Sequence, residues 1–172
     1  DWGMDVLKVG QSAGLGGFGA WQNNAVERVS DVSSRGVKVH ASGPVYAQLD
    51  LQYEQWNTGS SVTDLQTQLS MKAGSRWVEA RVASDPHLRE LAVTIPKHPA
   101  GKVFFGSTDI TGHAWSYMAT FGPQAMSGEP LGLAVFFKRR QFREFSEDEH
   151  NNVVVMKSNA GDFRYFFGAV WG

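Results

Sequence analysis

The amino-acid sequence predicts an all-β fold, an antiparallel β-sandwich of about ten strands, from three observations. Apolar and polar residues alternate with a period of two along most of the chain, as in strands with one buried face. Turn-forming residues interrupt these runs at short intervals, and no segment sustains the helical period of about 3.6 residues. The 19 glycines, 11 phenylalanines and 6 tryptophans fit strands joined by tight turns and argue against disorder.

The strand pattern is clearest at residues 45–53, where apolar side chains at odd positions alternate with mostly polar side chains at even positions. The alternation recurs at 65–71 and 77–82, and clusters such as Ser42-Gly43-Pro44 mark turns between the runs. In chain order, strands are expected at residues 37–40, 45–53, 65–71, 77–82, 91–95, 102–105, 113–121, 131–137, 152–157 and 163–171.

One short helix is expected at residues 143–151. Ser146 can cap its N-terminus, and the acidic residues 147–149 would then lie in the first turn, where negative charge is favourable. The basic residues just before it, Lys138, Arg139, Arg140 and Arg143, are interpreted as a solvated charge cluster balanced by the acidic residues of 144–149.

Length and charge exclude several classes of protein. A chain of 172 residues fits a single β-sandwich domain over 1–172, or one lobe of a longer protein. The formal net charge of −1 lacks the basic excess that non-specific nucleic-acid binding requires. No apolar run reaches the length of about 18 residues that a membrane span needs. The absence of cysteine excludes disulfides, thiolate metal sites and cysteine nucleophiles.

A glycine-rich segment at residues 14–19 matches the G-x-G-x-x-G pattern of dinucleotide-binding loops. The residues that follow it, 20–24, turn rather than begin an amphipathic helix, and no βαβ unit follows. We therefore favour a glycine-rich strand or bulge that packs closely against another backbone.

The first group of candidate catalytic residues is Lys97 and His98, which lie between two prolines. Pro96 and Pro99 stiffen the backbone around them, and such rigidity suits a placed general base or a lysine that binds a carboxylate. The alternative is an exposed polar turn after the strand at 91–95.

The second group lies on one face of the strand expected at 113–121, where His113, Trp115 and Tyr117 alternate with smaller residues. An indole can stack on the C–H face of a sugar, while His and Tyr can reach hydroxyls or transfer protons. Ordinary cross-strand aromatic packing is the alternative.

A third group, Trp77 and Arg81 with Arg76 just before them, shares the polar face of the strand at 77–82 with Glu79. This face could be a wet groove whose arginines bind a uronate carboxylate. A solvated sheet face with a cross-strand ion pair is the alternative.

No cofactor and no transition-metal site is predicted, because no two of the five histidines have the spacing of metal-ligand motifs. A hard cation such as calcium is the option left open, with ligands from Asp1 and Asp5 or from residues 147–149.

Five parts of the sequence together form a recognisable pattern: residues 5–10 with 14–17, 42–45 with 53–56, 73–77, 117–124 with 131–134, and 169–171. Together they resemble a bacterial family of unknown function associated with polysaccharide utilisation, which accompanies unsaturated-glucuronyl hydrolases and pectin-degrading proteins. The resemblance covers essentially the whole chain. Full-length members are longer, so it implies that this chain is the later part of a longer member, with the rest of that polypeptide as a partner. It also implies a sandwich similar to sugar-processing supersandwich domains and a periplasmic or extracellular location, but it supplies no catalytic residues.

The first expected function is an enzyme that acts on an acidic, uronate-containing polysaccharide or oligosaccharide, as a lyase or an unusual glycoside hydrolase. For β-elimination the base is His98 or His113 and the acid is Tyr117. The cation that faces the carboxylate is Lys97, Arg76 or Arg81.

The second expected function is a non-catalytic carbohydrate-binding or assembly lobe, in which tryptophans such as Trp77 and Trp115 are stacking platforms. An enzyme should bring a histidine, Tyr117 and a cation into one concave site. A binding lobe should instead present aromatic side chains in a row on an open face.

Overall fold

The computed structural model describes residues 6–86, 88–110 and 113–172, with side chains for 6–86, 88–107 and 114–172. Within these residues the chain forms thirteen strands and one short 3-10 helix, η1 (Arg139–Gln141). The strands are β1 (Phe18–Gln22), β2 (Ala25–Arg28), β3 (Ser34–Ser42), β4 (Tyr46–Asn57), β5 (Val62–Lys72), β6 (Val78–Asp85), β7 (Glu90–Pro96), β8 (Lys102–Ile110), β9 (His113–Gly122), β10 (Leu131–Lys138), β11 (Phe142–Glu147), β12 (Asn151–Lys157) and β13 (Asp162–Trp171). The expected all-β fold is confirmed.

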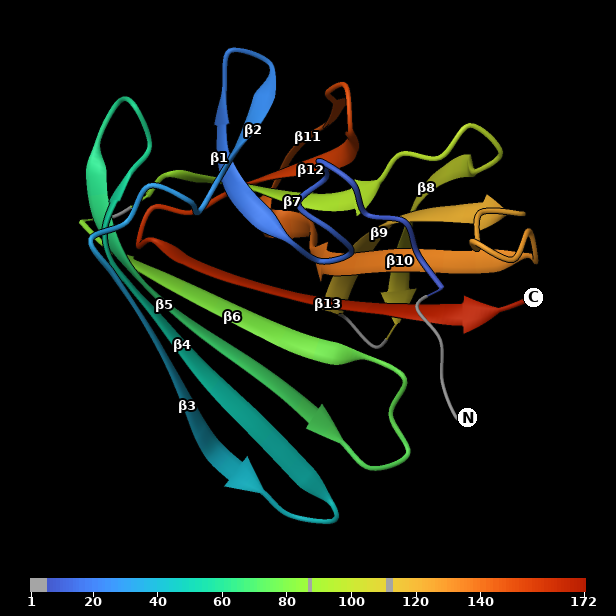
Figure 1. Ribbon diagram of the computed structural model, residues 1–172, viewed down its shortest axis with the longest axis horizontal. Helices are drawn as coiled ribbons and strands as arrows, with labels where there is room; N and C mark the ends of the chain where they lie inside the picture. Colours follow the sequence, from blue (N-terminus) through green and yellow to red (C-terminus); the bar gives the residue numbers. More distant parts are fainter. Residues whose placement is uncertain (1–5, 87, 111–112) are drawn as a thin grey trace.

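Two antiparallel sheets make up the sandwich (Figure 1). The smaller has five strands in the order β11-β12-β7-β1-β2, and the larger has eight in the order β3-β4-β5-β6-β13-β10-β9-β8. Each of the ten expected strands lies within or overlaps one of the observed strands. Strands β1 and β2 form an additional hairpin at one edge of the smaller sheet.

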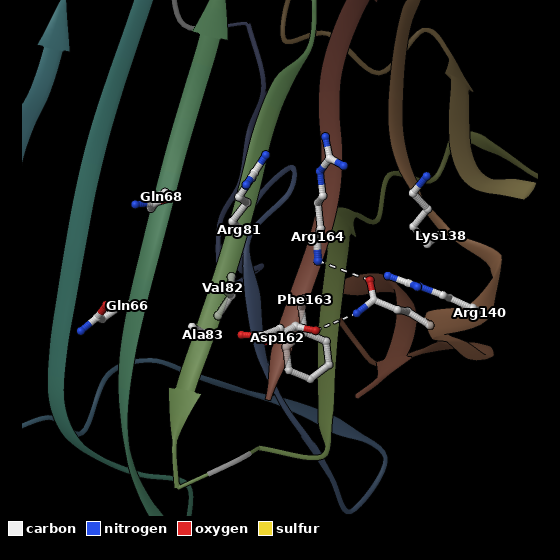
Figure 2. Close-up of a pocket in the computed structure, with 11 residues that line it drawn as sticks. Gln66, Gln68, Arg81, Val82, Ala83, Lys138, Arg140, Asp162, Phe163 and Arg164 are labelled. Carbon is white, nitrogen blue, oxygen red and sulfur yellow. Dashed lines mark hydrogen bonds between the residues drawn. The ribbon is translucent and has the colours of Figure 1, made fainter. Parts of the chain in front are cut away.

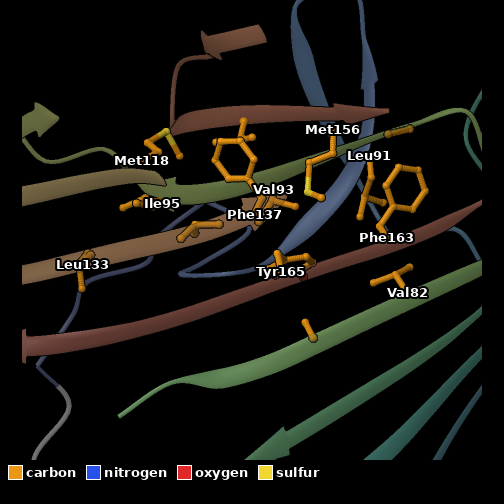
Figure 3. Packing of buried hydrophobic residues seen from close by; sticks show 14 of the residues in the cluster. Val82, Leu91, Val93, Ile95, Met118, Leu133, Phe137, Met156, Phe163 and Tyr165 are labelled. Carbon is orange, nitrogen blue, oxygen red and sulfur yellow. The ribbon is translucent and has the colours of Figure 1, made fainter. Parts of the chain in front are cut away.

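The core lies between the two sheets, where the alternating apolar faces meet (Figure 3). Leu91 and Val93 of β7 and Met156 of β12 pack in one cluster with Phe137 of β10 and Tyr165 of β13, and all five side chains are fully buried. Because successive side chains of a strand point to opposite faces, this packing turns the alternate residues of β6, β13, β10 and β9 outward.

Strands β3, β4 and β5 slope away from the smaller sheet in Figure 1. The inner face of this part of the larger sheet is only partly covered, and Val37 and Val39 of β3 are 71% and 61% exposed.

The expected helix at 143–151 is wrong, because this segment forms β11 and the turn into β12. Phe145 packs against Phe105 and Phe142 with ring centroids 4.1 and 4.6 Å apart, and this packing outweighs the local capping signal of Ser146. The carboxylate of Asp148 closes the turn by accepting the backbone N–H groups of His150 and Asn151 at 2.8 and 2.7 Å.

The glycine-rich segment packs against neighbouring backbone, which confirms the interpretation favoured above. The N–H of Gly16 donates to the Thr94 carbonyl and the N–H of Thr94 donates to the Gly17 carbonyl, both at 2.9 Å. A Cβ on Gly19 would lie against the backbone carbonyl of Glu27 in the paired strand β2. The glycines therefore permit a close approach of chains within the smaller sheet.

Candidate functional site

The outward face of the larger sheet carries a row of aromatic side chains on the neighbouring strands β13, β10 and β9, and a further one just before β6. The register places Glu79 of β6 opposite Phe166 of β13, Phe166 opposite Phe136 of β10, and Phe136 opposite Tyr117 of β9. Trp77 precedes β6 on the same face, with its ring edge-on to Phe136 at a centroid distance of 4.8 Å. This arrangement brings aromatic residues from distant parts of the sequence into one row.

Two glycines make room for the rings of this row. A Cβ on Gly168 would meet the ring of Trp77 at 2.7 Å, and a Cβ on Gly106 would meet the phenol oxygen of Tyr117 at 2.6 Å. The rings of Trp77 and Tyr117 can therefore lie across β13 and β8, with part of each side chain in contact with solvent.

A second row of side chains on the same face consists of cations. Each member lies two residues from the register position of the first row on the same strand. Arg81 of β6 lies opposite Arg164 of β13. Phe137 of β10 pairs with Tyr165, so the next position brings Lys138 beside Arg164. Three cationic side chains thus lie on the adjacent strands β6, β13 and β10, next to the aromatic row.

A hollow with a volume of about 450 Å³ opens along this cationic row (Figure 2). The residues that line it are Gln66, Gln68, Arg81, Val82, Ala83, Lys138, Arg140, Gln141, Asp162, Phe163 and Arg164. The side chain of Gln141 is held against β13 and forms one wall of the hollow. Its Nε2 donates to the backbone carbonyl of Asp162 at 2.7 Å, and its Oε1 accepts the backbone N–H of Arg164 at 3.4 Å. Positive side chains outnumber negative ones in this lining, so the hollow favours an anion.

Glu79 joins the two arginines. Its Oε1 accepts hydrogen bonds from Nε of Arg81 at 2.8 Å and from Nε of Arg164 at 2.6 Å. Burial by itself raises the pKa of Glu79, but the hydrogen bonds and charges of both arginines outweigh it and hold the pKa below its ordinary value. The carboxylate is therefore ionised at neutral pH. It engages both guanidinium groups through Nε, which leaves their terminal nitrogens for other acceptors.

Trp115 supports the end of the cationic row. The ammonium group of Lys138 lies 3.9 Å from the centre of its ring, and the ring of Phe166 is edge-on to it at 5.4 Å. A cation over the face of an indole is held by the ring quadrupole. One face of Trp115 is thus covered by Lys138 instead of being open for a sugar.

A family model described as a domain of unknown function, DUF4861, matches residues 1–172. The chain belongs to the DUF4861 family. Neither a curated protein nor a solved structure matches the chain. What this DUF4861 domain binds must therefore follow from the chemistry of its own surface.

Four of the predicted site residues come together on the outward face of the DUF4861 domain: Trp77, Arg81, Trp115 and Tyr117. Arg76 lies in the exposed turn before β6 and does not line the hollow. His113 begins β9, opposite Ile110, and its side chain lies outside the described part of the chain.

Lys97 and His98 lie elsewhere in the DUF4861 domain, in a second hollow with a volume of about 540 Å³ that also includes His150 and Gln124. The two hollows share no lining residue. Nζ of Lys97 pairs with Glu147 at 3.2 Å. Nδ1 of His98 accepts the N–H of Ala100 at 3.2 Å, so the neutral imidazole carries its proton on Nε2. In this tautomer the Nδ1 lone pair is engaged by the Ala100 N–H.

The sequence-based reasoning missed Arg164, and it interpreted Lys138 and Arg140 as part of a solvated cluster. The structure divides that cluster: Arg143 forms an ion pair with Glu90, whereas Lys138 and Arg140 line the first hollow. The alternation of Asp162, Arg164 and Phe166 with buried residues could have placed Arg164 on the outward face. Only the pairing of β13 with β6 shows that it is beside Arg81.

Calcium is the cation that the sequence leaves possible. Among the described residues, no group of three or more His, Asp or Glu side chains lies close enough together to hold a metal ion. Asp148 uses both carboxylate oxygens as hydrogen-bond acceptors within the β11–β12 turn and for Val26 of β2. Asp1 and Asp5 lie outside the described residues. No helix within the described part of the DUF4861 domain is long and apolar enough to cross a membrane.

Proposed function

We propose that this DUF4861 domain binds acidic, uronate-containing polysaccharides or oligosaccharides on the outward face of its larger sheet. The observation that supports this most strongly is the pair Arg81 and Arg164, held side by side by Glu79 at the edge of a hollow. The terminal nitrogens of a guanidinium match the geometry of a carboxylate, and each charge-assisted hydrogen bond contributes about 1.5–3 kcal/mol.

The neighbouring aromatic row supplies the second half of a glycan site. Trp77 and Tyr117 are partly exposed on the same outward face as the arginines, and aromatic rings stack on the apolar C–H faces of sugars. A carboxylate receptor next to aromatic platforms favours an acidic sugar over a free inorganic anion, because inorganic anions gain nothing from the rings.

The second candidate function is β-elimination on the same face, where the partly exposed phenol of Tyr117 is a candidate acid. In such a reaction a base takes the C5 proton of the uronate, the C4–O bond breaks and a C4–C5 double bond forms. The Tyr117 hydroxyl would protonate the departing oxygen. His113, on the same strand, would be the base, because His98 lies in the other hollow.

The proposed setting of this activity rests on the resemblance to a family that accompanies polysaccharide-degrading enzymes. A polymeric acidic substrate is met outside the cytoplasm, so the proposed location is periplasmic or extracellular. The domain would work there as part of a longer polypeptide in polysaccharide utilisation, either as an enzyme or as a binding or assembly lobe.

Calorimetric titration with trigalacturonate tests the binding proposal, with maltotriose as the neutral control. Arg81→Gln and Arg164→Gln should each weaken trigalacturonate binding by about tenfold, which corresponds to the loss of one charge-assisted contact. Arg139→Gln removes the same charge from an exposed residue that does not line the hollow, and should leave the affinity within about twofold. Equal binding of trigalacturonate and maltotriose would refute an acidic-sugar site.

The elimination proposal has a separate readout, because it creates an unsaturated uronate that absorbs ultraviolet light. Absorbance should rise when the protein is incubated with polygalacturonate, and Tyr117→Phe should abolish the rise while retaining trigalacturonate binding within about threefold. Binding without any rise in absorbance would assign the face to binding alone.

A further inference from the structure

The cationic row is the feature whose geometry goes furthest beyond a single carboxylate site. Arg81, Arg164 and Lys138 lie at matching positions on three adjacent strands. Neighbouring strands are about 4.8 Å apart, so the row extends for about 10 Å across the sheet, perpendicular to the strands.

Each cation of the row is held by a partner on the same face. Glu79 fixes Arg81 and Arg164 through their Nε atoms, and Trp115 holds the ammonium of Lys138 over its ring at 3.9 Å. Trp115 belongs to β9, the strand beyond β10, so Lys138 leans away from the arginine pair. The row therefore has two separate positive centres, the arginine pair and the ammonium group.

A single carboxylate has two oxygens, and the paired arginines can engage both of them. When one ligand carboxylate is bound to both arginines, it does not pair with Lys138, although Lys138 borders the same hollow. A second anionic group on the same ligand could form an ion pair with the Lys138 ammonium. The single negative charge of Glu79 does not neutralise the three cations of the row, so the face retains positive charge for a ligand with more than one anionic group.

We infer that the ligand is a chain of consecutive acidic sugars that crosses the strands, with one carboxylate on the Arg81–Arg164 pair and the next on Lys138. This inference rests on the proposed function and specifies its substrate class: a run of uronates and not one uronate at the end of a neutral chain. Lys138 sets the preference for a second charge, and Trp115 is a positioning residue that acts through Lys138.

The test compares galacturonic acid with trigalacturonate in calorimetric titrations of the wild-type protein and of Lys138→Gln. Wild type should bind trigalacturonate at least about tenfold more tightly than galacturonic acid. Lys138→Gln should lower this ratio by about fivefold, the usual effect of one partly exposed ion pair. Trp115→Leu should lower the ratio similarly because it releases the ammonium, whereas Trp115→Phe, which keeps an aromatic face, should retain part of it.

Arg139→Gln is the matched control for loss of one positive charge, and it should leave the ratio unchanged. Thermal unfolding of each variant verifies that it is folded. A wild-type ratio near one, or the same ratio in Lys138→Gln as in wild type, would overturn the inference while the proposed acidic-sugar site stands. Failure of wild type to bind either galacturonic acid or trigalacturonate would overturn both.

Discussion

Glu79 is a residue whose charge state connects the stability of the sheet to the geometry of the site. Its pKa lies below its ordinary value of 4.5 because Arg81 and Arg164 favour the ionised form more than burial disfavours it. A carboxyl whose pKa is lowered by folding stabilises the folded state above its unfolded pKa, and this contribution is lost as the pH falls through the folded pKa.

Glu79→Gln should therefore lower the free energy of unfolding at about pH 7, where it leaves two arginines side by side without their counter-ion. The difference between wild type and Glu79→Gln should shrink as the pH falls from about 5 to about 3, because wild-type Glu79 becomes protonated and loses the same charge. Urea titrations across this pH range measure the difference. A difference that stays constant with pH would contradict the assigned role of the charge.

Gly19 lies where the backbone of the paired strand leaves no room for a side chain. A Cβ there would lie against the Glu27 carbonyl of the paired strand, so Gly19→Ala should destabilise the protein by about 2 kcal/mol. Gly36→Ala is the control, because a Cβ at Gly36 would lie 3.6 Å from the Gln52 side chain, an ordinary contact. Urea unfolding should show a change within about 0.5 kcal/mol for the control. Equal effects at the two positions would contradict the close approach at Gly19.

At the scale of elements, Asp148 connects two hairpins. Its carboxylate closes the β11–β12 turn and also accepts the N–H of Val26 in β2 at 3.0 Å. The side chain of Asn151 donates to Asp148 at 2.8 Å and accepts the Ser12 hydroxyl at 2.6 Å, which extends the network to the N-terminal segment. Burial by itself raises the pKa of Asp148, but the hydrogen bonds that it accepts outweigh this and lower the pKa.

Asp148→Ala should cost at least about 2 kcal/mol of unfolding free energy, because several donors lose a charged acceptor. Amide hydrogen exchange should accelerate at Val26 in particular, since its N–H loses its partner across the two hairpins. Glu149→Ala, at a neighbouring side chain that is 87% exposed, is the matched control and should leave both measurements unchanged. Unchanged exchange at Val26 in Asp148→Ala would show that the hairpins are joined by other contacts.

The strands could be predicted from the sequence wherever one face is buried, because alternation records burial directly. The sequence does not predict strand β11, because Ser146 and the acidic residues after it match the pattern of a helix N-terminus. The packing that favours a strand here, Phe145 against Phe105, involves β8, which is far away in sequence. The outward position of Arg81 and Tyr117 followed from the same alternation. Their proximity to Arg164 and Lys138 did not, because local sequence does not encode which strands pair.

At the scale of the whole molecule, the two sheets are joined by a buried hydrogen bond as well as by apolar packing. The Tyr165 hydroxyl, from β13 of the larger sheet, donates to the Gly16 carbonyl at 2.8 Å. Gly16 in turn donates its N–H to Thr94 of β7 in the smaller sheet. Tyr165 is fully buried, and this burial, with a smaller contribution from Tyr53, raises the pKa of its phenol.

Tyr165→Phe should cost about 1–2 kcal/mol at neutral pH, because the Gly16 carbonyl loses its donor inside the core. The unfolding free energies of wild type and Tyr165→Phe should also depend differently on pH in the alkaline range. Above the ordinary tyrosine pKa of about 10 the unfolded chain releases the phenol proton and the folded chain keeps it, so wild type loses about 1.4 kcal/mol per pH unit from this group. Tyr165→Phe lacks this loss, and the stabilities of the two proteins should converge in urea titrations between about pH 9 and about pH 11. Parallel pH profiles would mean that the phenol reaches solvent in the folded protein, and that the sheets are held together at this point by apolar packing alone.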